Sequence, residues 1–237
     1  SATLMNLIYI TGSSSGLGKA LTELLLEDNN NKVVGVARRE TIKHERYTHY
    51  SLDLKETINE NIFQKLPADC EKVVLINNAG AVGPITRVGF QSYRELANNY
   101  TVNVTAPSFL CNQFVKVYQN EKLQKIIINV SSGAGKSPIE AWSTYCASKA
   151  ALDMFTQVLQ AEYPYFKVFA VAPGIVDTPM QDNIRNADEL HFPHLDRFQS
   201  YKANGDLVSA RKVALKYLKI IQEPQNFKEV LLSVRDF

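Results

Sequence analysis

Tyr145 and Lys149 lie four residues apart in the segment WSTYCASKAAL (142–152), whose small and apolar residues are typical of a helix. Residues at positions i and i+4 face the same side of a helix, one turn apart. For this pair alone, a tyrosine ring packed on a lysine stem is the simpler interpretation. The pair also suits acid–base chemistry, because an ammonium group beside a phenol favours the phenolate. The elements around the pair have to decide between the two.

Short apolar runs rich in β-branched residues recur along the chain, separated by segments of helical length. Most runs are apolar almost throughout, which is typical of a parallel sheet covered by helices on both faces. The predicted strands are 7–10, 32–37, 47–52, 72–77, 125–130, 167–172 and 229–234, and the predicted crossover helices are 17–28, 91–119, 144–163 and 209–222. The pattern therefore predicts an α/β fold with a doubly wound parallel sheet of about seven strands.

No linker or change of composition divides the 237 residues, so we expect one domain over residues 1–237. The stretch 175–205 follows the sixth predicted strand, is rich in charged and aromatic residues, and is expected to be irregular. Open α/β sheets bind ligands at the carboxyl ends of their strands, so a long insertion there is a candidate substrate lid. We call residues 175–205 the lid segment.

Composition and charge exclude several function classes. The net charge of +2 comes from scattered Lys and Arg without a basic stripe, so we expect no nucleic-acid partner. No apolar run approaches the roughly 20 residues that span a bilayer, so we expect no membrane partner. Three cysteines without a C-x-x-C pair favour reduced core thiols and a cytoplasmic location. His191 and His194 lack a complementary ligand, so we expect no metal site.

A loop rich in glycine and serine, TGSSSGLG (11–18), follows the first predicted strand and leads into a helix. Gly12, Gly16 and Gly18 permit a tight turn and let backbone N–H groups approach a pyrophosphate at the positive end of that helix. The spacing G-x-x-x-G-x-G differs from the G-x-G-x-x-G fingerprint, and a plain strand-to-helix turn is the alternative. The strand before the loop and the helix after it favour a dinucleotide-binding loop.

The second predicted strand ends in GVARR, with Arg38 and Arg39 at the position that selects between the two nicotinamide cofactors. An acidic residue there would bind the ribose 2′-hydroxyl of NAD, whereas a guanidinium group pairs with the 2′-phosphate of NADP. Two solvated arginines are the alternative. The sequence predicts NADP(H) as the cofactor.

Five motifs occur in a fixed order: the glycine loop, NNAG (77–80), NVSS (129–132), YCASK (145–149) and PGIVDT (173–178). With them the chain resembles the short-chain dehydrogenase/reductases over essentially its whole length. The resemblance implies a Rossmann-type fold and an oxidoreductase.

The same resemblance implies roles for four residues. Tyr145 would donate a proton to the carbonyl oxygen of a small-molecule substrate as hydride arrives from the nicotinamide. Lys149 would lower the pKa of Tyr145 and hold the nicotinamide ribose. Ser132 would orient the carbonyl oxygen by a hydrogen bond. Asn103, in TVNVTAP, would perturb its helix and position a water that connects the lysine to solvent.

It also implies a set of cofactor-binding residues at the ends of the predicted strands. Alternatives stay open for two groups, because Asp53 would also suit a helix cap and NNAG would also suit bracing of the sheet. Besides Arg38, Arg39, Tyr145 and Lys149, the implied set is Gly12, Ser14, Ser15, Gly16, Leu17, Gly18, Asp53, Leu54, Asn78, Ala79, Gly80, Pro173, Gly174, Val176 and Thr178.

Within the family the chain is most similar to the group of sepiapterin reductases and bacterial benzil reductases that form (S)-benzoin. That group implies NADPH-dependent reduction of one carbonyl of a vicinal dicarbonyl such as benzil, or of a pterin side-chain ketone. Two positions depart from the group. Ser15 replaces the basic residue of many NADP-dependent relatives, and Asp236 in the tail FKEVLLSVRDF is offset from the aspartate that anchors a pterin. We therefore expect a benzil-like substrate.

Three alternatives remain. They are a sepiapterin-type pterin ketone reductase, a 3-oxoacyl-thioester reductase, and a non-catalytic NADP(H)-binding sensor. The second would need a basic docking cluster that the sequence lacks, and the complete set of four catalytic residues argues against the third. The resemblance also implies a homodimer or homotetramer formed through the helices at 91–119 and 144–163.

Overall fold

Seven parallel strands form one sheet in the order β3-β2-β1-β4-β5-β6-β7. The computed structural model describes residues 4–237, so the first three residues of the predicted domain lie outside it. The strands are β1 (Met5–Thr11), β2 (Asn31–Ala37), β3 (Tyr47–Ser51), β4 (Cys70–Asn77), β5 (Gln124–Val130), β6 (Lys167–Ala172) and β7 (Leu231–Ser233). The order reverses between β1 and β4, which confirms the doubly wound, Rossmann-type sheet and places a ligand-binding switch point there.

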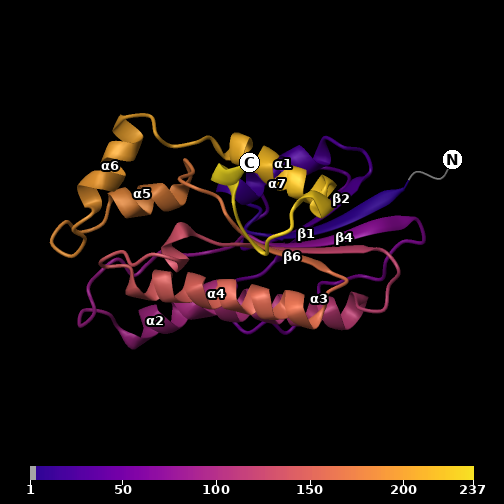
Figure 1. Cartoon of the computed structure of the whole chain (residues 1–237), viewed down its shortest axis with the longest axis horizontal. Coiled ribbons are helices and arrows are strands. Elements are labelled where there is room, and N and C mark those ends of the chain that lie inside the picture. Colours follow the sequence, from indigo (N-terminus) through magenta and orange to yellow (C-terminus); the bar gives the residue numbers. More distant parts are fainter. Residues whose placement is uncertain (1–3) are drawn as a thin grey trace.

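The central strands are apolar throughout because helices cover both faces of the sheet (Figure 1). Alternate residues of β1 point to opposite layers, so Ile8 packs with the helices of one face and Tyr9 with those of the other. The first face carries α1 (Gly16–Leu26) and α7 (Ala210–Gln222). The second face carries α3 (Ala106–Tyr118) and α4 (Ser143–Glu162). Among residues 4–237, no helix is long and apolar enough to cross a bilayer.

The prediction of one continuous helix at 91–119 is wrong. The structure has α2 (Tyr93–Tyr100), a π-helical turn (Thr101–Thr105) and then α3. Asn103 lies in the π-helical turn and donates from Nδ2 to the Ala81 carbonyl oxygen at 2.7 Å. A π-helical turn inside a helix often marks a functional site, because it turns a side chain away from its regular position.

The prediction that the lid segment is irregular is also wrong, since it contains α5 (Pro179–Arg185) and α6 (Leu195–Ala203). Pro179 favours the first turn of α5, and Ile184 and Phe198 bury their side chains in a shared apolar cluster. Helices this short are stabilised by such packing and not by the propensity of their own residues.

Two smaller differences from the sequence predictions remain. Strand β7 is shorter than the predicted 229–234, and the Cys70 and Cys146 side chains, which were predicted to lie in the core, are only half-buried.

Candidate active site

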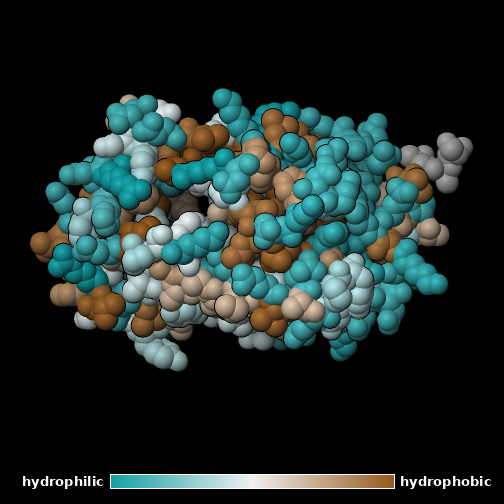
Figure 2. Space-filling model, viewed as in Figure 1, coloured by the Kyte–Doolittle hydropathy of each residue, from teal (hydrophilic) through white to brown (hydrophobic). Residues whose placement is uncertain are grey.

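Apart from Asn103, Tyr145 and Lys149, which lie on helical segments, the predicted site residues follow the carboxyl ends of six strands. Parallel strands bring these ends to one edge of the sheet. In the space-filling view the surface is hollowed beside this edge, between the segment of α5 and α6 and the rest of the molecule (Figure 2). The segments there are the glycine loop after β1, Arg38–Arg39 after β2, Asp53–Leu54 after β3, Asn78–Gly80 after β4, Ser132 after β5 and Pro173–Thr178 after β6.

The glycine loop has the tight geometry that a bound pyrophosphate needs. Gly12 and Gly16 have φ angles of +71° and +55°, in the left-handed region that favours glycine. A Cβ atom on Gly18 would lie 2.1 Å from the Gly12 carbonyl oxygen, so no side chain fits there. Ser15, which precedes α1, gives no side-chain cap to the first N–H groups of the helix. These groups are therefore available to an anion.

Thr11 at the end of β1 holds the NNAG segment beside the glycine loop. Its Oγ1 accepts hydrogen bonds from the N–H groups of Asn78 at 3.0 Å and Ala79 at 2.9 Å. The Asn78 side chain donates to the Thr11 carbonyl oxygen at 3.1 Å, and that of Asn77 donates to Asn129 Oδ1 at 2.9 Å. Both asparagines thus brace the sheet, as the alternative interpretation of NNAG held. Sequence reasoning missed Thr11, whose signal was a polar residue ending an apolar strand.

The residues expected near the adenine end differ in exposure. Arg38 and Arg39 are exposed, and neither forms an ion pair with an acidic side chain of residues 4–237. Asp53 is exposed and its Oδ1 accepts from the Lys55 N–H at 3.0 Å, so it caps a turn and not a helix. Leu54 is buried. The two guanidinium groups are therefore available to a phosphate.

The segment after β6 closes against the glycine loop from the opposite side. A Cβ atom on Gly16 would lie 3.3 Å from the Thr178 methyl group. Gly174 has a φ angle of +71°, and Val176 forms a parallel bridge with Val208. The segment after β6 therefore packs directly against the glycine loop.

Tyr145 and Lys149 lie on adjacent turns of α4 and both are buried. Lys149 Nζ lies 5.7 Å from the centre of the Tyr145 ring and donates to the Val130 carbonyl oxygen at 2.9 Å. Ser132 accepts a hydrogen bond from the Ala134 N–H at 3.1 Å, which orients its side chain at the end of β5. The structure thus brings Ser132, Tyr145 and Lys149 together.

Burial dominates the proton affinity of both α4 side chains. It raises the pKa of Tyr145 to about 12, opposed by a hydrogen bond from Ser132. It lowers the pKa of Lys149 to about 8, opposed by the charge of Asp153. The structure differs here from the expectation that Lys149 lowers the pKa of Tyr145, because loss of solvent disfavours the charged form of each group. Ser132 is the group that favours the phenolate.

Asn103 reaches the same centre from the π-helical turn, which is the helix perturbation that the sequence predicted. Its Oδ1 accepts from the Ala81 N–H at 2.9 Å, and its Nδ2 donates to Ser148 Oγ at 3.2 Å. A Cβ atom on Gly80 would lie 3.3 Å from Asn103 Oδ1 and 3.5 Å from Lys149 Nζ. All four predicted catalytic residues are therefore neighbours.

An apolar cluster covers Tyr145 and includes side chains of the lid segment. The Trp142 ring lies 5.4 Å from that of Tyr145, edge to face, and stacks on Phe192 at 5.8 Å. The Tyr145 hydroxyl donates to Met180 Sδ at 3.9 Å. Sequence reasoning missed Trp142, although it lies three residues before Tyr145 and therefore near the same helix face.

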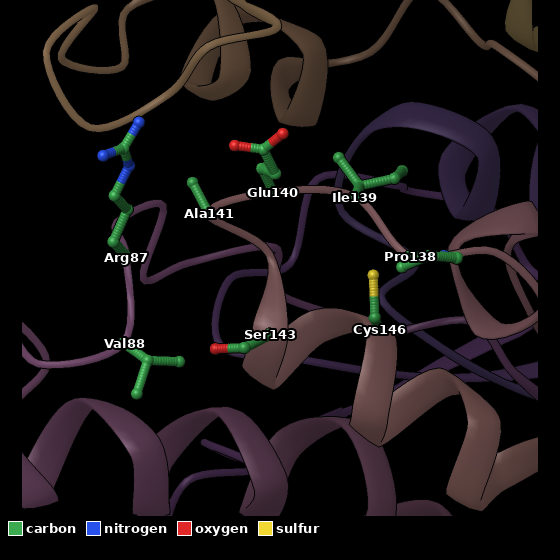
Figure 3. A pocket seen from close by; sticks show the side chains of 8 residues that line it. All are labelled: Arg87, Val88, Pro138, Ile139, Glu140, Ala141, Ser143 and Cys146. Atoms are coloured by element: carbon green, nitrogen blue, oxygen red, sulfur yellow. The ribbon is translucent and has the colours of Figure 1, made fainter.

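A separate surface pocket of 340 Å³ lies on the outer side of this cluster (Figure 3). The Cys146 side chain points into it, and Cys146 and Ile139 also pack against the apolar cluster. Neither Tyr145 nor Ser132 lines the pocket, so it is distinct from the candidate catalytic centre. The lining residues are Arg87, Val88, Pro138, Ile139, Glu140, Ala141, Ser143 and Cys146.

A family model described as short chain dehydrogenase matches residues 6–189. The chain therefore belongs to the short-chain dehydrogenase/reductase family and is an oxidoreductase, as its motifs predict. The family binds nicotinamide cofactors, which the geometry of the glycine loop fits.

Among individual proteins, the chain is similar to benzil reductase ((S)-benzoin forming) of Bacillus cereus, with 37% identity over 95% of this chain and 97% of that protein. It is also similar to sepiapterin reductase of Rattus norvegicus, with 31% identity over 90% of each. The crystal structure of a short chain dehydrogenase/reductase from Saccharomyces cerevisiae superposes with a TM-score of 0.83 at 28% identity, covering 98% of this chain and 96% of that one.

Proposed function

We propose that the protein is an NADPH-dependent carbonyl reductase that reduces one carbonyl of an apolar vicinal dicarbonyl such as benzil. The observation that carries the proposal is the meeting of Ser132, Tyr145 and Lys149 beneath an apolar cover. Polar groups that move a proton are thereby placed in a site that excludes water, where hydrogen bonds to a developing charge are strongest.

A bound nicotinamide supplies the hydride, and the side chains of this chain handle the proton. Tyr145 holds a neutral phenol at neutral pH because its pKa is about 12, so it is a proton donor. The proton moves from Tyr145 Oη to the carbonyl oxygen, and Ser132 stabilises the remaining phenolate by its hydrogen bond. Lys149 Nζ lies close enough to add a positive charge at this stage.

The choice of NADPH rests on Arg38 and Arg39. Both guanidinium groups follow β2, are exposed, and form no ion pair within residues 4–237. A 2′-phosphate at this edge would receive charge-assisted hydrogen bonds from them. Because Ser15 is neutral, the two arginines carry most of the phosphate recognition.

The choice of an apolar dicarbonyl rests on the cover over Tyr145. The Met180 thioether contacts the Tyr145 hydroxyl, the Trp142 ring packs against the Tyr145 ring, and Phe192 stacks on Trp142. Each unpaired polar edge of a pterin would cost about 1–3 kcal/mol in such surroundings. Asp236, which is offset in the sequence from the aspartate that anchors a pterin, is exposed in the last turn of the chain. The Met180 side chain must move away from the Tyr145 hydroxyl when the substrate binds, because it contacts the atom that the carbonyl oxygen has to reach.

The test is kcat/KM for benzil and for sepiapterin, each measured with NADPH and with NADH. We expect the highest value for benzil with NADPH. A clear preference for sepiapterin would mean that another residue anchors the pterin ring. Tight binding of NADPH without oxidation by any member of a panel of diketones would favour the non-catalytic sensor.

We also infer a homodimer or homotetramer formed through α3 and α4. These helices expose Phe109, Met154 and Val158, with 39%, 60% and 47% of their surfaces accessible. Apolar side chains that share one exposed layer favour an interface between protein chains. Light scattering on the purified protein measures the mass, and a monomer would contradict the inference.

A further inference from the structure

Three consecutive hydrogen bonds connect the glycine loop to the end of β2 through two side chains of β3. Ser13 Oγ and Tyr47 Oη are 2.9 Å apart, and Tyr47 Oη and His49 Nδ1 are 2.7 Å apart. His49 Nε2 lies 3.0 Å from the Ala37 carbonyl oxygen. We call this set the Tyr47–His49 bridge. It ends one residue before Arg38.

A glycine in β2 makes room for the bridge. Gly35 pairs in register with His49, and a Cβ atom on Gly35 would lie 2.0 Å from Tyr47 Oη and 2.6 Å from Ser13 Oγ. Glycine inside a strand is unfavourable because it has no side chain to pack, and it often marks a close approach of other groups. The absence of a side chain at Gly35 is therefore required by the bridge.

Each bond of the bridge has a defined donor when His49 is neutral. A carbonyl oxygen only accepts, so His49 Nε2 donates to Ala37 and Nδ1 accepts from Tyr47. The Tyr47 hydroxyl then accepts from Ser13, which is fully buried. A second link joins the same two segments, because Thr41 Oγ1 donates to the Ser14 carbonyl oxygen at 2.9 Å. The glycine loop and the segment at 37–41 are thus fixed relative to each other.

We propose that Tyr47 and His49 are positioning residues that set the spacing between the glycine loop and Arg38–Arg39, and with it the preference for the cofactor that carries a 2′-phosphate. The inference rests on the proposed NADP(H) function. The pyrophosphate, which both cofactors share, would bind at the glycine loop, whereas only NADPH has a phosphate for the segment that follows Ala37. Loss of the bond to Ala37 therefore affects NADPH more than NADH.

The test is equilibrium binding of NADPH and NADH, measured by fluorescence titration, for the parent and for His49→Phe. Phenylalanine keeps a ring of similar size and loses both hydrogen bonds. We expect the Kd of NADPH to rise about three- to tenfold, in line with the loss of a partly buried hydrogen bond, and the Kd of NADH to stay within about twofold. Because the arginines remain, kcat at saturating NADPH should be retained.

Tyr50→Phe is the matched control, since Tyr50 lies on the same strand but packs against the opposite face of the sheet. It should leave both Kd values unchanged. Equal weakening of both cofactors by His49→Phe, or an unchanged Kd for NADPH, would overturn the inference. A selective rise in the Kd of NADPH for Tyr50→Phe would also overturn the inference.

Tyr47→Phe is the second variant, and it covers the case in which His49→Phe fails to fold. It keeps the ring but removes the hydroxyl from the centre of the bridge, so we expect the Kd of NADPH to rise more than the Kd of NADH. Unchanged binding of both would refute the bridge as a positioning device. The fluorescence titration of the parent with NADPH and NADH distinguishes failure of the proposed NADP(H) function from failure of the proposed role of the Tyr47–His49 bridge. A parent without a preference for NADPH refutes the proposed cofactor, whereas a parent that prefers NADPH beside an unaffected His49→Phe refutes the inference alone.

Discussion

Replacing Lys149 by methionine should abolish turnover and leave the fold at least as stable at neutral pH. Lys149 is 4% exposed, and its ammonium has one hydrogen-bond acceptor, the Val130 carbonyl oxygen. Burial lowers the pKa of the ammonium from 10.5 to about 8. The folded protein therefore holds a proton on Lys149 less tightly than the unfolded chain does, and the protonated side chain destabilises the fold.

The magnitude follows from the two pKa values. A fall from 10.5 to about 8 corresponds to roughly 3 kcal/mol, at about 1.4 kcal/mol for each tenfold change in proton affinity. Methionine removes this cost but leaves the Val130 carbonyl oxygen without its donor, which costs about 1–3 kcal/mol. At neutral pH the relief of the burial cost therefore equals or exceeds the cost of the unpaired carbonyl oxygen. We expect Lys149→Met to match the parent or exceed it by up to about 2 kcal/mol.

The sign of the pH dependence distinguishes this account from a general loss of packing. Below about pH 8 the side chain is protonated in both states, so the full cost is present. As the pH rises from about 8 to 10.5, the folded protein has lost the proton while the unfolded chain keeps it, and the parent gains stability. About 2 kcal/mol of this gain should appear between about pH 7 and pH 9.5. The variant lacks this contribution.

Urea unfolding at about pH 7 and about pH 9.5, monitored by circular dichroism, measures the free energy of unfolding of the parent and the variant. The decisive quantity is the difference between them, because it cancels the titration of all other groups. Lys219→Met, which removes an exposed ammonium from α7, controls for the loss of charge itself. A difference between parent and Lys149→Met that does not change with pH would refute the reasoning.

Three further predictions concern the chemistry and the cofactor. Tyr145→Phe removes the proton donor but not the glycine loop, so kcat should fall about 10²- to 10⁴-fold while the Kd of NADPH stays nearly constant. Activity within a few-fold of the parent would exclude Tyr145 as the acid. Replacing Arg38 and Arg39 together by alanine should weaken the binding of NADPH far more than that of NADH. The expected loss of binding free energy is about 1.5–3 kcal/mol for each charge-assisted hydrogen bond that the change removes. Equal Kd changes for the two cofactors would assign the arginines a structural role. Gly18→Ala places a Cβ atom 2.1 Å from the Gly12 carbonyl oxygen, so both cofactors should bind weakly even where circular dichroism shows a folded protein. Normal binding would show that the loop adapts.

The sequence by itself determined the features that are local. β-branched apolar runs specify buried parallel strands because each residue's own backbone preference and hydrophobicity act within a few positions. Gly12 and Gly16 sit at left-handed φ angles, which is a property of single residues and can be inferred from a motif. The sequence motifs also located the four catalytic side chains, with Ser132 after β5, Tyr145 and Lys149 on α4, and Asn103 in the turn before α3.

The tertiary structure decided what depends on residues distant in the chain. The pKa values of Tyr145 and Lys149 follow from burial, and part of the cover comes from Met180 and Phe192 in the lid segment. The helices α5 and α6 form because the apolar cluster holds them, although their own sequences do not predict them.

The Tyr47–His49 bridge shows the same dependence most directly. It joins Ser13 to Tyr47, 34 positions later in the chain, in a space that exists because Gly35 lacks a side chain. Local sequence cannot predict this geometry. Desolvation and side-chain hydrogen bonds depend on which segments are close in space, and the assembled sheet determines which segments these are.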